Sequence, residues 1–211
     1  GYYPEAFVNM IALLGWNPGI EQEIFSMEEL TTLFSLERVI KSGARFNPEK
    51  AKWFNQQYLR NRSDSLLAED FMPLLHDRGI TTTRQKAEQV VSLIRNRADF
   101  VHDFWDLSDY FFIPPESYDP AMQKKIWKPE IPSIITGVRE VLTLCEPFDT
   151  ASLEQALHQW IGARELKTGQ VMNALRLCLV GKPQGPGLAD IMAVIGREET
   201  IKRIDHALNT L

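Results

Sequence analysis

Signals for the start of a helix recur along the whole chain of 211 residues. An apolar pattern with a period of 3.6 residues covers Pro4–Gly15, and Ser26-Met-Glu-Glu29 matches a capping box, in which serine and glutamate satisfy each other's free backbone amides. Asn47-Pro48 is a strong N-terminal cap for a longer helix over 48–62. No stretch alternates apolar and polar residues as a strand does, so the sequence predicts an all-α fold.

Further helices are expected over most of the remaining chain. They cover about 66–77, 83–98, 100–106, a segment opened by Asp119-Pro120, and then 132–144, 151–164, 168–180, 188–195 and 197–208. Breaks in the pattern near 62–65 and 128–132 divide the chain into three regions, 1–62, 63–130 and 131–211.

The charge of the chain limits the partners that it can bind. A net charge of -5 lowers the expectation of non-specific nucleic-acid binding. The charge is uneven, however, because residues 37–62 hold seven Lys/Arg and two Glu, whereas 99–119 hold six acids and no Lys or Arg. Local basic faces of this kind can still meet a phosphate backbone. Without a signal peptide or a long apolar run, we expect a cytoplasmic protein that does not enter a membrane.

Motifs for catalysis are missing from the sequence. The four histidines are scattered, and neither a phosphate-binding glycine loop nor a nucleophile motif occurs. His102 and Asp103 lie beside Asp99 and Asp106, which is compatible with a weak cation site but is more typical of a solvated acidic face. We therefore expect no catalytic residue, no metal site and no cofactor in this chain.

Two stretches need an explanation beyond helix packing. The glycines and prolines of 181–187 either form a stiff loop between two helices or expose backbone to which a flat ligand can approach closely. In the helix expected over 83–98, Arg95 lies well off the apolar stripe, while Arg97 lies at the edge of the stripe. An arginine at such an edge can bury its stem and hold its guanidinium at a fixed place. From the pattern alone, plain surface charge remains the simpler interpretation of both arginines.

The opening block GYYPEAFVNMIALLGW resembles the signature that follows the catalytic core in bacterial glutamyl-tRNA synthetases, which are class I aminoacyl-tRNA synthetases. The similarity continues through EIFSMEEL, FSLERVIKSGARFNPEKAKWFNQQYLR, KTGQVMNALRLCLVGKPQGPGL and IGREETIKRIDHAL, and so covers essentially the whole chain. The resemblance implies a small helical stem-contact region over 1–62, followed by a two-part helical anticodon-binding region over 63–130 and 131–211.

The resemblance also implies which activity and partners to expect. The family attaches glutamate to its tRNA through a glutamyl-adenylate formed from ATP with Mg²⁺. The His-x-Gly-His and Lys-Met-Ser-Lys-Ser signatures of its catalytic domain do not occur here, and the chain opens without an initiator Met. We therefore expect an excised fragment that is inactive alone and monomeric, with glutamate tRNA as its partner. Contacts to ATP, Mg²⁺ and glutamate belong to the missing part.

Four residues take anticodon-binding roles by resemblance. Arg97 matches the arginine that discriminating family members aim at the last anticodon base, a cytosine, whose O2 and N3 accept hydrogen bonds from a donor-only guanidinium. Members with relaxed tRNA choice often carry another residue there. Arg176 matches an arginine near the first anticodon base. Gly187 and Leu188 lie where backbone and an apolar residue contact the splayed bases, and Gly185 departs from relatives that carry a side-chain donor there.

Contacts to the tRNA backbone are expected from basic residues that fix register without reading sequence. The candidates are Arg38, Lys41, Arg45, Lys52 and Arg95. Two other classes of protein remain as alternatives, namely a helical module for protein–protein interaction and the C-terminal region of a class I lysyl-tRNA synthetase.

Overall fold

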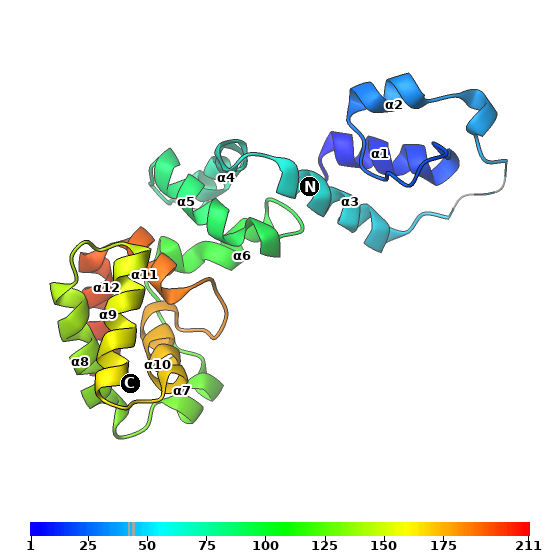
Figure 1. Ribbon diagram of the computed structural model, residues 1–211. Helices are drawn as coiled ribbons and strands as arrows, with labels where there is room; N and C mark the ends of the chain where they lie inside the picture. The colour runs from blue at the N-terminus through cyan, green and yellow to red at the C-terminus, as the bar shows by residue number, and fades with distance from the viewer. Residues whose placement is uncertain (42, 44) are drawn as a thin grey trace. The chain divides into compact units, whose positions relative to one another are not determined.

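The computed structural model describes residues 1–41, 43 and 45–211, which are predominantly helical (Figure 1). Over these residues it contains twelve α-helices, three short 3₁₀ helices and no strand. A single antiparallel bridge joins Trp16 to Val39 in this described part. The prediction of an all-α fold is therefore confirmed.

The chain forms two compact units, residues 1–107 and residues 108–211. The first contains α1 (Pro4–Gly15), α2 (Met27–Leu33), η1 (Leu36–Arg38), α3 (Pro48–Asn61), α4 (Asp64–Asp77), α5 (Arg84–Ile94), η2 (Arg95–Arg97) and most of α6 (Asp103–Ser108). The second contains η3 (Asp109–Phe111), α7 (Pro120–Ile126), α8 (Ile131–Leu144), α9 (Thr150–Ala163), α10 (Thr168–Val180), α11 (Leu188–Ile195) and α12 (Arg197–Thr210). The division into three functional regions stays a prediction.

Capping side chains explain where several helices begin. Ser26 and Glu29 form the expected capping box at the start of α2, and the Asn47 side chain accepts hydrogen bonds from two backbone amides at the start of α3. Asp119 caps α7 by accepting a hydrogen bond from the backbone amide of Met122 at 2.6 Å. These polar side chains satisfy amides that have no partner inside the helix, so they fix its first turn.

In the first unit, α1 packs on α3 and α4 packs on α5 (Figure 1). The apolar stripe of α5 is buried, and its last member, Ile94, has no exposed surface. Phe71 of α4 packs edge-on against Phe104 of α6, with 5.5 Å between the ring centroids. The apolar face of α5 thus meets α4 as its 3.6-residue pattern predicts.

The expected helix over 83–98 is too long, because α5 ends at Ile94 and residues 95–97 form a 3₁₀ turn. The helix expected over 100–106 instead begins at Asp103. The Asp103 carboxylate accepts hydrogen bonds from the backbone amides of Asp99 at 3.0 Å and Phe100 at 2.9 Å. The side chain at the first position of α6 thus satisfies two amides that precede the helix, as a cap does.

The second unit is built from α8 to α12, in which α8 packs against α9 and α12 (Figure 1). Arg203 of α12 is only 2% exposed. Its Nη1 donates to the backbone carbonyls of Tyr110 at 2.6 Å and Leu179 at 3.0 Å, and its Nε donates to Glu199 at 2.7 Å. One buried guanidinium therefore ties α12 to η3 and to the end of α10.

Many large apolar side chains are exposed among the described residues of 1–46. Leu36 is 78% exposed, and the other large exposed side chains are Tyr2, Phe7, Val8, Ile11, Ile20, Met27, Leu33, Phe34, Val39, Ile40 and Phe46. Among the described residues, one small buried cluster lies around Met10 and Phe54 and another around Trp16 and Phe25. Exposed apolar patches, when large, usually mark a surface that meets another protein part.

Candidate nucleic-acid interface

Arg97 is exposed at the end of η2. Among the described residues, none forms a hydrogen bond or ion pair with its guanidinium. The neighbouring residues are held firmly, since Ala98 is buried and Asp99 is bonded on several sides. The turn therefore presents a charged donor group to solvent from a fixed backbone.

Arg95 has the opposite surroundings. Its Nη1 lies 2.5 Å from Asp64 Oδ1, its Nη2 donates to the backbone carbonyl of Arg60, and its side chain is 19% exposed. The expected placement of Arg97 at the core rim and Arg95 away from it is therefore wrong. The helical pattern does not apply beyond Ile94, because the backbone changes there to a 3₁₀ turn.

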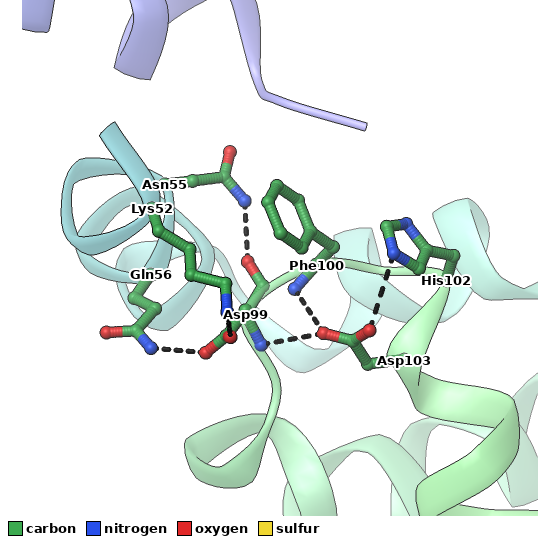
Figure 2. Close-up of polar contacts among 7 residues, drawn as sticks. All are labelled: Lys52, Asn55, Gln56, Asp99, Phe100, His102 and Asp103. Atoms are coloured by element: carbon green, nitrogen blue, oxygen red, sulfur yellow. Dashed lines mark hydrogen bonds and ion pairs between the residues drawn. The ribbon is translucent and has the colours of Figure 1, made fainter. Parts of the chain in front are cut away.

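Behind this turn, α3 meets residues 99–103 in a polar network (Figure 2). Lys52 Nζ lies 2.7 Å from Asp99 Oδ2, Gln56 donates to the other oxygen of Asp99, and Asn55 Nδ2 donates to the Asp99 carbonyl at 2.6 Å. The hydrogen bond from Lys52, followed by that from Gln56, holds the pKa of Asp99 below its usual range. This network braces the backbone two residues from Arg97.

The acidic stretch is therefore not the solvated face that its composition predicts. Asp99 binds side chains of α3, and Asp103 binds backbone amides. Asp103 Oδ1 also lies 3.4 Å from Nε2 of the exposed His102. Figure 2 draws this contact. Within the described residues, no group of three or more His, Cys, Asp or Glu side chains is arranged to hold a metal ion.

The five basic residues expected to contact a nucleic-acid backbone fall into two groups. Arg38 donates to the backbone carbonyl of Pro18, and Lys52 is paired with Asp99, so both are engaged within the fold, as Arg95 is. Lys41 and Arg45 are exposed, and no described residue pairs with either. Their roles as contacts to a nucleic-acid backbone stay predictions, and the structure leaves Lys41 and Arg45 the most available.

In the second unit, the predicted residues gather around one cavity. Arg176, Gly187 and Leu188 line a cavity of about 270 Å³ between α9, α10 and the start of α11. Arg176 is half-buried and its Nη2 donates to the backbone carbonyl of Pro186 at 2.8 Å. Leu188 is only 3% exposed, so it forms the floor of the cavity, while Gly187 at its edge is exposed.

The loop over 181–187 leaves room for this arginine. Gly185 has φ of +144°, and a Cβ atom there would lie 2.9 Å from Arg176 Nη1 and 3.2 Å from the Tyr110 hydroxyl. A larger residue would displace the guanidinium, because 2.9 Å is shorter than ordinary carbon contacts. Gly185, where some relatives carry a side-chain donor, therefore leaves the space that the Arg176 guanidinium occupies here.

Sequence reasoning missed other members of this cavity. Glu154, His158, Met172 and Asn173 also line it. Glu154 and His158 lie four residues apart, and Asn173 lies three residues before Arg176, so each pair shares one helical face. That spacing is the one signal in the sequence, and it does not by itself separate a cavity from an ordinary polar surface.

These two places offer donor groups, a cavity and exposed backbone. Such features suit unstacked bases, which are recognised on their edges and by stacking rather than by charge alone. No described helix is both long and apolar enough to cross a membrane.

Comparison with known proteins gives consistent matches. The family model of an anticodon binding domain matches residues 66–208, and that of the catalytic domain of class I tRNA synthetases (E and Q) matches residues 1–53. Glutamate–tRNA ligases from Flavobacterium psychrophilum and Parabacteroides distasonis are 48% and 44% identical over 100% of this chain. The chain spans 42% of the length of each relative.

Solved structures agree with the sequence comparison. A glutamate tRNA ligase from Elizabethkingia meningosepticum, in complex with its amino acid, matches with a TM-score of 0.96 and 42% identity. A glutamate-tRNA synthetase from Elizabethkingia anophelis matches with a TM-score of 0.92 and 40% identity. Both matches cover 100% of this chain, and 42% and 41% of those chains.

Proposed function

The chain belongs to the anticodon-binding domain family, with glutamate–tRNA ligases as its relatives, and we propose that it recognises glutamate tRNA. In the longer protein it serves a ligase that joins glutamate to this tRNA at the expense of ATP, with Mg²⁺. ATP, Mg²⁺ and glutamate are bound outside residues 1–211, so the chain alone is inactive. We place the protein in the cytoplasm as a monomer.

Arg97 reads the last anticodon base in this proposal. The observation that carries it is an exposed guanidinium without a described partner, on a turn whose backbone is braced by α3. Unpaired cytosine offers two acceptors to such a group, whereas guanine presents donors at the same edge. An arginine here therefore favours cytosine and penalises guanine.

Arg176, Leu188 and Gly187 form the second contact, near the first anticodon base. The support is their common cavity, in which the Pro186 carbonyl orients the guanidinium over an apolar floor. Lys41 and Arg45 are the best placed of the basic residues to contact tRNA phosphate, because they are exposed and no described residue pairs with them. Residues 1–62 are the stem-contact region, and 63–130 and 131–211 are the two parts of the anticodon-binding region.

The exposed apolar surface of residues 1–46 fits the same proposal. The catalytic-domain model matches residues 1–53, and the relatives are more than twice as long as this chain. We assign this surface to contact with the remainder of the catalytic domain in the longer protein. A module for protein–protein interaction is not favoured, and neither is a lysyl-tRNA synthetase, because the relatives are glutamate–tRNA ligases.

The test compares two neighbouring arginines. Arg97→Gln is expected to lower the preference for C over G at the last anticodon base by roughly 1–3 kcal/mol, the worth of a good bidentate base contact. Arg95→Gln is the matched control, because it removes a guanidinium two residues away that is engaged with Asp64. It should lower the free energy of unfolding and leave the preference unchanged.

Filter binding measures the base preference of each protein, with glutamate tRNA and with a tRNA variant that has G at the last anticodon position. Equal binding of the two tRNAs by the unmutated longer protein would rule out the role of Arg97. A loss of preference in Arg95→Gln that equals that in Arg97→Gln would show that the turn as a whole, and not one guanidinium, is responsible.

A further inference from the structure

An ion pair joins the loop over 181–187 to a distant element of the second unit. Lys182 Nζ lies 2.7 Å from Asp109 Oδ1, at the start of η3. The same ammonium lies 5.3 Å from the centroid of the Tyr110 ring, which is 3% exposed. Lys182 is therefore held by a carboxylate and by a buried ring face, so its position is fixed in two directions.

The loop also has little freedom at its other contacts. The Gly181 carbonyl accepts a hydrogen bond from the backbone amide of Asp119 at 2.8 Å. A Cβ atom at Gly181 would lie 2.7 Å from the Ser117 carbonyl, which shows how closely the two segments approach. Near its far end, the Pro186 carbonyl receives the hydrogen bond from Arg176.

Through these contacts, the position of the loop over 181–187 determines the orientation of the Arg176 guanidinium. Its Nη2 follows the Pro186 carbonyl, while its Nη1 lies against the backbone of Gly185. A shift of the loop away from η3 moves both of these neighbours together. The guanidinium then turns with them, because side chains at recognition sites keep their direction only when their supports are fixed.

We propose that Asp109 and Lys182 are positioning residues for base recognition by Arg176. The ion pair holds the loop against η3, and the loop in turn holds the guanidinium. This inference rests on the proposed function, since it deepens the role of the cavity around Arg176. Neither residue touches the base.

The rival interpretation is that Lys182 binds tRNA phosphate directly and that Asp109 merely masks its charge. The two interpretations predict opposite results for Asp109→Asn. If Lys182 is a phosphate contact, the variant frees its charge, binds every RNA more tightly and has a steeper salt dependence. If the pair positions the loop, the variant loses selectivity at one base.

The experiment measures binding of the 211-residue chain to a glutamate tRNA anticodon stem–loop and to a variant with a purine in place of the pyrimidine at the first anticodon position. Asp109→Asn is expected to lower the ratio of the two affinities by at least about fivefold, the lower end of what one lost base contact gives. Combining Asp109→Lys with Lys182→Asp restores the ion pair in reverse without the contact to the Tyr110 ring, and is expected to recover part of the ratio.

Asp205→Asn is the matched control. It removes an ion pair with Arg139 in the same unit, of comparable exposure and away from the loop. It should leave the affinity ratio unchanged. A ratio unchanged in Asp109→Asn overturns the proposal, whether the affinity for both RNAs rises or stays the same.

Hydrogen exchange of the loop amides separates this proposal from the proposed function. Asp109→Asn, unlike Asp205→Asn, is expected to raise exchange over 181–187 in the protein without RNA. If the unmutated chain binds neither RNA, the proposed function fails. Unchanged exchange in Asp109→Asn would overturn the positioning role in any case.

Discussion

Replacing Arg203 by methionine tests how far one buried guanidinium supports the second unit. Methionine fills a similar volume but donates no hydrogen bond, so the carbonyls of Tyr110 and Leu179 lose their bonds to Arg203, and Glu199 loses its ion pair. Hydrogen bonds to a charged group contribute about 1.5–3 kcal/mol each. Glu199 is 29% exposed and regains water, which limits the loss.

We therefore expect Arg203→Met to lower the free energy of unfolding of residues 108–211 by about 3–5 kcal/mol, as for the loss of one partner from a buried ion pair. Burial already lowers the pKa of Arg203, so the folded environment carries a desolvation cost that these bonds offset. Urea unfolding followed by circular dichroism measures the change. The control is Lys202→Met, an exposed neighbour, for which a change within about 0.5 kcal/mol is expected. A value for Arg203→Met within about 1 kcal/mol of wild type would refute the reasoning.

Three further changes have directions that the structure sets. Gly181 has φ of +75°, and a Cβ atom there would lie 2.7 Å from the Ser117 carbonyl. Gly181→Ala should therefore lower the free energy of unfolding by about 1–3 kcal/mol in urea titrations. An unchanged free energy of unfolding would contradict this close approach. Asn9→Ala removes three hydrogen bonds made by a fully buried side-chain amide. It should lower the free energy of unfolding of the first unit by about 2–4 kcal/mol in the same assay. A loss below about 1 kcal/mol, roughly the net contribution of one hydrogen bond, would contradict this expectation. The hydrogen bond from Lys52 lowers the pKa of Asp99 in the folded protein. The stability that the ionised Asp99 contributes is therefore present above the unfolded pKa, near 3.8, and is lost as the pH falls through the lower folded pKa. Asp99→Asn should therefore destabilise at pH 7 and have less effect as pH falls below 3.8; an equal effect at both ends would exclude this linkage.

Local signals predicted most helices because the residues that start and stop them act on their own neighbours. The bounds of α10 and α11 agree with the pattern, and the capping box at Ser26 forms as expected. The end of α5 was predicted wrongly for a different reason. It is decided by Asp64, which binds Arg95, and by Asp103, which takes two backbone amides. The partners across such contacts cannot be read from spacing along one helix.

The candidate site, too, was predicted in part. Family resemblance pointed to Arg97 and Arg176, and the structure gives one an exposed position and the other a cavity. The sequence could not predict which basic residues are left without an internal partner and so can contact a nucleic acid. Arg38, Lys52 and Arg95 are engaged by groups 20, 47 and 31 residues away in the chain. Composition counts such charges as free, whereas packing decides which ones remain so.

The amide of Asn55 restricts which residues this position accepts. Its Oδ1 accepts the backbone amide of Tyr3 at 2.8 Å, while its Nδ2 donates to the Asp99 carbonyl, and the side chain has no exposed surface. Aspartate keeps the acceptor but faces the carbonyl with a second oxygen. Leucine keeps the branching at Cγ but is larger and leaves both backbone groups without a bond. Aspartate would thus loosen the link to the turn that carries Arg97, whereas leucine would loosen the links to both that turn and the start of α1.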